Sequence, residues 1–69
     1  MNIFGERLKI LRIERKIPQK DIAVELNITI RTYQYYEAGR LEPNLLNLVK
    51  LAKFFNVTTD YLLGCVDEI

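Results

Sequence analysis

The sequence predicts an all-α fold built from five short helices, with no strand. Apolar residues recur at the three- and four-residue spacing of a helix, as do Ile22, Ala23 and Leu26, which fall on one stripe. Four of the expected helices are followed by Asn or Gly, the residues that best tolerate the left-handed backbone of a sharp helix exit. Because the chain has 69 residues, of which 49% are hydrophobic, we expect one small folded domain.

The first expected helix spans about residues 3–15, with Asn2 as its N-cap. Gly5 lies in its first turn, where glycine costs up to about 1 kcal/mol relative to alanine. The stripe that this helix is expected to bury consists of Phe4, Leu8 and Leu11.

The second helix is expected to begin near Gln19, and the third to run from about residue 30 to residue 38. Pro18 fixes the entry of the second helix but cannot cap it, so we expect Asp21 to compensate by facing the positive helix end. Thr29 is the expected cap of the third helix. A tight turn therefore joins two short helices, a motif that also occurs in proteins that never touch nucleic acid.

The fourth helix is expected over about residues 45–55, with Asn44 as its cap. Thr58 is the expected cap of a short fifth helix. We expect that helix to end with the domain, which covers residues 1–64, and a short C-terminal tail over residues 65–69 to follow.

Five segments of the chain follow one another in a distinctive order and spacing. They are ERLKILRIERKI (6–17), QKDIAVELNI (19–28), YYEAG (35–39), EPNLLNLVKLAKFFNV (42–57) and DYLLG (60–64). In this arrangement the chain resembles the lambda repressor-like helix-turn-helix family, the Cro and phage-repressor or Xre type of bacterial and phage regulators. The resemblance implies a compact five-helix DNA-binding domain over residues 1–64, with the helix-turn-helix at helices two and three.

Composition argues against several other classes of protein. Cys65 is the only cysteine and the chain has no histidine, so an internal disulfide is excluded and a zinc site would lack its ligands. The sequence has no Gly-rich phosphate loop and no pairing of a nucleophile with a base, so we predict neither an enzyme nor a bound metal or cofactor. No stretch approaches the roughly 18 apolar residues of a membrane span, so we expect a cytoplasmic protein without a membrane partner.

The net charge is only +1, but the charged residues are unevenly distributed. Asp60, Asp67 and Glu68 make the end of the chain acidic. This distribution suggests a polarised surface with its basic side towards phosphate, although each charge taken singly could simply be solvated. The basic residues in the first 42 positions are Arg7, Lys9, Arg12, Arg15, Lys16, Lys20, Arg31 and Arg40.

The third helix is expected to divide into a core face and a DNA face. Tyr33 and Tyr36 are three residues apart and fall on the core side. The family more often has a branched aliphatic residue at the position of Tyr33, so its hydroxyl should reach an edge or a partner. The residues left for contacts to base edges are Ile30, Arg31, Gln34 and Tyr35.

Each of these residues matches a different group on DNA. Arg31 suits the two acceptors of guanine, Ile30 a thymine methyl group, and Gln34 adenine or a backbone group. Tyr35 suits phosphate or a base edge. The resemblance places base contacts at Ile30, Arg31 and Tyr35, while the alternatives are a solvated Arg31 and a protein contact through Ile30.

A second set of residues is expected to contact phosphate and so to fix orientation rather than sequence. Gln19 opens the second helix, where free backbone amides also favour an anion. Arg40 supplies a charge in the following loop, and Asn44 either contacts phosphate or serves only as an N-cap. By resemblance, Thr29 and Thr32 also lie near the phosphates.

The resemblance also implies a structural ion pair. Family members often join an Arg late in the first helix to the Glu near the end of the third, and Arg12 and Glu37 occupy those positions. We expect the two to bond at low exposure and to hold the recognition helix at its angle.

The fifth helix and the tail are expected to form a dimer interface. Leu62 and Leu63 could instead fill the core, whereas Val66 and Ile69 lie beyond the expected helix end and are harder to explain in that way. The complete set assigned to the interface is Tyr61, Leu62, Leu63, Val66 and Ile69.

These features together predict a sequence-specific double-stranded DNA-binding transcriptional regulator, expected to be a repressor. It would act as a homodimer on an inverted repeat whose half-sites lie one helical turn, about 34 Å, apart. The alternative is a protein-interaction module of the same fold, such as an antitoxin or an adaptor, whose main partner is another protein.

Overall fold

The computed structural model describes residues 3–69, and within this range the fold is all-α, as the sequence predicts. The first helix ends one residue before the expected boundary, and its expected cap, Asn2, lies outside the described residues. No helix in residues 3–69 is long and apolar enough to cross a membrane. The helices are α1 (Ile3–Glu14), α2 (Gln19–Leu26), α3 (Ile30–Ala38), α4 (Leu45–Phe55) and α5 (Thr59–Leu63).

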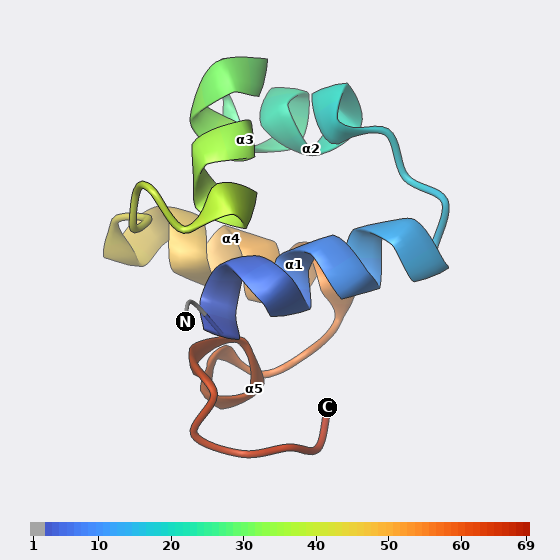
Figure 1. The fold of residues 1–69 in the computed structure, drawn as a ribbon, viewed down its shortest axis with the longest axis vertical. Coiled ribbons are helices and arrows are strands. Elements are labelled where there is room, and N and C mark those ends of the chain that lie inside the picture. Colours follow the sequence, from blue (N-terminus) through green and yellow to red (C-terminus); the bar gives the residue numbers. More distant parts are fainter. Residues whose placement is uncertain (1–2) are drawn as a thin grey trace.

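The helices enclose one core. In Figure 1, α2 and α3 lie side by side at the top, α1 crosses below them, and α5 lies below α1 with the C-terminal tail. α2 and α5 also pack against α4. The fully buried side chains come from all five helices; the largest are Leu8, Leu11, Ile22, Tyr33, Leu51, Phe55 and Leu62.

Leu62 corrects one expectation about the dimer interface. Its side chain has an exposed fraction of 0% and belongs to the core, so it cannot contact a second copy. The reason is that α5 presents a single apolar side to α1 and α4, and Leu62 occupies that side. Leu63, the next residue, is exposed.

Local signals set the helix boundaries. Thr29 Oγ1 accepts the amide of Thr32 at 3.0 Å, and Asn44 Oδ1 accepts the amide of Asn47 at 2.8 Å. The exits of α2, α3, α4 and α5 are left-handed, as expected. Lys16 adopts the same conformation (φ 56°) after α1, which its residue type did not indicate.

Gly5 lets α1 approach α3 closely. A Cβ at this position would lie 2.5 Å from the carbonyl oxygen of Glu37 and 2.6 Å from that of Tyr36, both on the backbone of α3. Such contacts are far shorter than van der Waals separation, and backbone atoms inside a helix cannot swing away. The glycine therefore does more than weaken the first turn of α1: it sets the distance between the two helices.

We expect Gly5→Ala to lower the free energy of unfolding by about 1–3 kcal/mol, the usual cost of overpacking. Helix propensity alone would give the opposite sign, a gain of up to about 1 kcal/mol. Urea unfolding measures the change, with Lys9→Ala on the exposed side of α1 as the control. A Gly5→Ala protein as stable as the parent would show that the close approach imposes no constraint.

Candidate nucleic-acid interface

α3 presents the residues expected to contact bases on one side and core residues on the other. Tyr33 and Tyr36 are buried, with exposed fractions of 0% and 3%. Ile30, Arg31 and Gln34 are exposed, although Ile30 is a large apolar residue at the start of a helix. A short helix thus separates a scaffold face from a face that is free to contact a ligand.

Two side chains on the outer face of α3, Arg31 and Tyr35, contact each other. Arg31 Nη1 donates a hydrogen bond to the hydroxyl of Tyr35 at 3.3 Å, across one helical turn. The Tyr35 ring is half-buried, so it provides a support that limits the directions open to the guanidinium. The contact places the Arg31 side chain along the outer surface of α3, where it stays exposed.

The start of α2 lies beside this outer face. Gln34 Nε2 on α3 donates to Gln19 Oε1 on α2 at 3.1 Å. Thr29 and Thr32, at the beginning of α3, bond to each other through their hydroxyls at 2.9 Å. The structure therefore places Gln19 beside Gln34, and Thr29 beside Thr32 at the first turn of α3.

Arg40 and Asn44 lie on the loop that follows α3, and both are exposed. Asn44 has a definite structural role, because its side-chain oxygen caps α4. A contact from either residue to phosphate stays a prediction.

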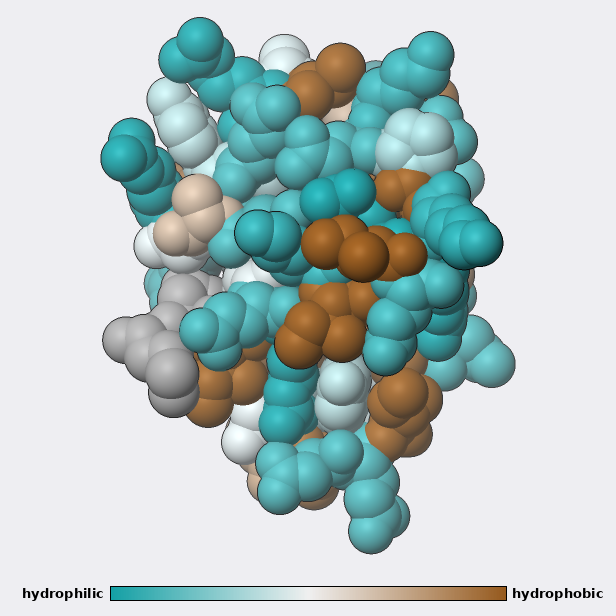
Figure 2. Space-filling model, turned by 45° about the vertical axis from the view of Figure 1, so that its right-hand side comes forward, coloured by the Kyte–Doolittle hydropathy of each residue, from teal (hydrophilic) through white to brown (hydrophobic). Residues whose placement is uncertain are grey.

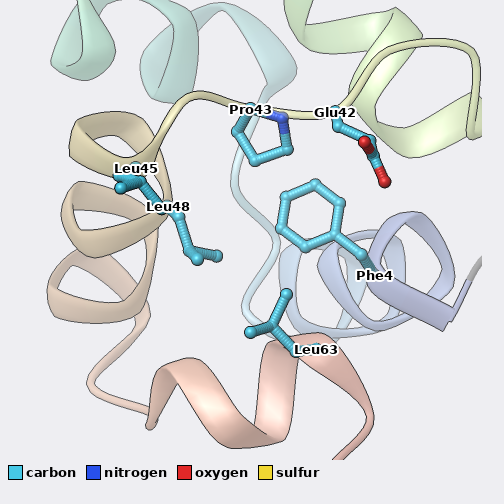
Figure 3. Close-up of a pocket in the computed structure, with 6 residues that line it drawn as sticks. All are labelled: Phe4, Glu42, Pro43, Leu45, Leu48 and Leu63. Carbon is cyan, nitrogen blue, oxygen red and sulfur yellow. The ribbon is translucent and has the colours of Figure 1, made fainter.

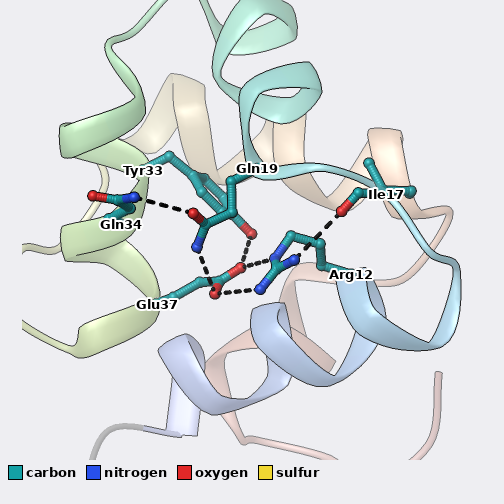
Figure 4. A network of polar contacts seen from close by, with 6 residues as sticks. All are labelled: Arg12, Ile17, Gln19, Tyr33, Gln34 and Glu37. Carbon is teal, nitrogen blue, oxygen red and sulfur yellow. Dashed lines mark hydrogen bonds and ion pairs between the residues drawn. The ribbon is translucent and has the colours of Figure 1, made fainter.

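The carboxylate of Glu37 is the centre of a polar network that joins three helices (Figure 4). Arg12 on α1 donates to it through Nε at 2.6 Å and Nη2 at 3.2 Å. Tyr33 donates its hydroxyl at 2.6 Å, and Gln19 donates Nε2 at 3.3 Å. The side chains of Arg12 and Glu37 are only 17% and 7% exposed, so the expected pair forms with little access to water.

The electrostatics keep the donors of this network protonated. Burial raises the pKa of Tyr33 far above its ordinary value, and its hydrogen bond to Glu37 raises it further. The hydrogen bond to Glu37 likewise raises the pKa of Arg12. The buried hydroxyl of Tyr33 thus has the hydrogen-bond partner that we expected, and this partner is the charged carboxylate of Glu37.

Arg7 has a role that sequence reasoning did not find. Its guanidinium lies 4.2 Å from the centre of the Tyr61 ring and donates to the carbonyl oxygens of Tyr61 and Val66. It also pairs with Asp67 at 2.9 Å. These contacts hold the tail against α1 and α5, and no local pattern could indicate them because the partners are 54 to 60 positions apart.

The tail and α5 leave apolar side chains on the surface. Leu63, Val66 and Ile69 are exposed, whereas Tyr61 is half-buried beneath Arg7. Figure 2 shows one face of the molecule, on which apolar side chains interrupt a mostly hydrophilic surface. Three of the five residues expected at a dimer interface are therefore accessible.

An apolar groove of about 270 Å³ lies next to Leu63 (Figure 3). It is formed by the start of α1, the loop before α4, the first turn of α4 and the end of α5. Its lining residues are Phe4, Glu42, Pro43, Leu45, Leu48 and Leu63.

The raised pKa of Tyr33 predicts how stability depends on pH. Above about pH 10 an unfolded tyrosine releases its proton while the folded Tyr33 keeps it, so the free energy of unfolding falls as pH rises. One such group contributes a slope of up to about 1.4 kcal/mol per pH unit. We expect Tyr33→Phe to reduce that slope, measured by urea unfolding between pH 8 and pH 11.

Tyr35→Phe is the matched control, because it removes a hydroxyl from the same helix outside the core. It should keep the parent slope. Equal slopes in the parent and in Tyr33→Phe would contradict the assignment of the buried proton to Tyr33.

The comparisons with known proteins agree on one family. A family model described as helix-turn-helix matches residues 8–62. The chain is 44% identical over 61 residues to the SPbeta prophage-derived HTH-type transcriptional regulator YonR of Bacillus subtilis, covering 88% of this chain and 56% of the relative. It is 36% identical over 55 residues to the cryptic phage CTXphi transcriptional repressor RstR of Vibrio cholerae, covering 80% and 50%. The chain thus spans about half the length of these relatives.

Solved structures agree with the sequence comparison. A transcriptional regulator from Listeria innocua superposes with a TM-score of 0.87 at 36% identity, covering 96% of this chain and 62% of that chain. The P22 c2 repressor in complex with synthetic operator 9T superposes with a TM-score of 0.84 at 30% identity, covering 91% and 96%. The chain therefore belongs to the helix-turn-helix family, and its fold is that of the lambda repressor-like domains.

Proposed function

We propose that this chain is a sequence-specific double-stranded DNA-binding transcriptional regulator, acting as a cytoplasmic repressor. The observation that carries the proposal is the outer row of α3, where Ile30, Arg31 and Gln34 are exposed on a helix whose other side is locked into the core. The relatives support it, since RstR is named a transcriptional repressor and the P22 c2 repressor was solved with operator DNA.

In this proposal α3 lies in the major groove with its first turns against the base edges. Arg31 reads guanine through paired donors, with Tyr35 limiting its movement. Ile30 packs on a thymine methyl group, which accounts for an apolar side chain in water at the start of the helix. The carboxamide of Gln34 hydrogen-bonds either adenine or a group of the DNA backbone.

The phosphate contacts flank this row. Thr29 and Thr32 lie at the N-terminal end of α3, and Arg40 and Asn44 lie beyond its C-terminal end. Gln19 lies beside the second half of α3, where it contacts Gln34 and Glu37. Contacts on both sides would fix the depth and angle of α3 without reading sequence.

The proposed assembly is a homodimer on an inverted repeat. A single domain of 69 residues makes few contacts to DNA, and a second copy doubles them. The interface would use Leu63 and the half-buried Tyr61 on α5, together with Val66 and Ile69 on the tail that Arg7 holds in place. The two recognition helices would then face half-sites about 34 Å apart.

Selection of bound duplexes from a random library tests the proposal. We expect enrichment of an inverted repeat, and we expect Arg31→Ala to lose about 1–3 kcal/mol of discrimination at one base pair of each half-site. Lys53→Ala, which removes an exposed charge from α4, is the matched control and should keep the parent specificity.

Two results would count against this account. Enrichment of a single half-site, without its inverted repeat, would contradict the proposed homodimer. No enrichment at any salt from low to physiological concentration would favour the alternative, a protein-interaction module of the same fold such as an antitoxin or an adaptor.

A further inference from the structure

The hydrogen bonds around Glu37 have a fixed direction. A carboxylate accepts hydrogen bonds and cannot donate them. Its Oε2 accepts Arg12 Nε and the Tyr33 hydroxyl, and its Oε1 accepts Arg12 Nη2 and Gln19 Nε2. Gln19 must therefore turn its amide nitrogen, and not its oxygen, towards Glu37.

The orientation of Gln19 in turn fixes the direction of its hydrogen bond to α3. With Nε2 of Gln19 at Glu37, Oε1 of Gln19 lies on the opposite side and accepts the Nε2 of Gln34 at 3.1 Å (Figure 4). If Gln19 were reversed, its oxygen would meet the carboxylate oxygen, two acceptors without a proton between them. The charge of Glu37 thus sets the orientation of two carboxamides in succession.

We infer that Gln34 is a specificity-determining residue for adenine and that Glu37 and Gln19 are positioning residues that fix its orientation. Once one N–H of Gln34 is donated to Gln19, its Oε1 and its second N–H remain on the exposed side of α3. One acceptor and one donor complement the N6 donor and N7 acceptor of adenine in the major groove. The inference rests on the proposed function, since it needs α3 to face DNA.

The chain of hydrogen bonds from Glu37 through Gln19 to Gln34, here called the relay, gives Gln19 an effect that a phosphate contact alone would not have. Losing a phosphate contact weakens binding about equally for all sequences. Losing the relay frees the Gln34 carboxamide to rotate, so that its oxygen and its nitrogen exchange places. Discrimination should then fall at one base position, while the other positions keep theirs.

Gln19→Met tests the relay, because methionine keeps the length of the side chain and removes both polar atoms. Glu37 retains its three bonds from Arg12 and Tyr33 in this variant. In duplex selection we expect the preference for adenine at one position of each half-site to fall about fivefold or more, as it should in Gln34→Ala. Arg40→Met, a change at a proposed phosphate contact, is the control and should lower affinity uniformly.

An unchanged preference for adenine, or a uniform loss of affinity in Gln19→Met, would overturn the relay while leaving the proposed function in place. Failure of the parent protein to enrich any duplex would overturn the proposed function instead. A second measurement needs no DNA: in ¹⁵N spectra, the side-chain amide protons of Gln34 should exchange faster with water in Gln19→Met than in the parent. Equal exchange rates in the two proteins would also overturn the relay.

Discussion

The arrangement of this domain depends on one nearly buried carboxylate, that of Glu37. An ion taken out of water is costly unless donors surround it, and removing a single partner leaves an uncompensated charge. Arg12 from α1, Tyr33 from α3 and Gln19 from α2 supply those donors, and the Glu37 side chain is 7% exposed. Because the donors come from three helices, the carboxylate is satisfied only when all three take their native positions.

This requirement explains why the two faces of α3 differ so sharply. Gly5 brings α1 against the backbone of α3 beside Glu37, and the Tyr33 and Tyr36 rings pack at an angle of 74° beneath it. The inner face is thereby fixed by sterics and charge together. The outer face carries Ile30, Arg31 and Gln34, which are exposed and lie outside the core. Rigid support beneath an exposed row of side chains suits the DNA contact proposed for this helix.

The sequence was sufficient for features that depend on neighbouring residues. Caps and left-handed exits need only a few positions, so the helix boundaries agreed with expectation to within a residue. Features that depend on distant packing were not predictable. Leu62 fitted either a core or a surface on so short a helix, the contact of Arg7 with Asp67 spans 60 positions, and the role of Gly5 needs the backbone of α3. The DNA contacts themselves stay a prediction.

The coupling energy between Arg12 and Glu37 tests most directly whether this carboxylate organises the fold. It can be measured in a double-mutant cycle that compares the parent, Arg12→Met, Glu37→Gln and the double variant. All four proteins are unfolded with urea in the same concentration of a stabilising osmolyte. A pair this shielded from water should give a coupling energy above about 1.5 kcal/mol, beyond the roughly 0.2–1 kcal/mol of exposed pairs. A value below about 0.5 kcal/mol would show that the three helices hold their places without it.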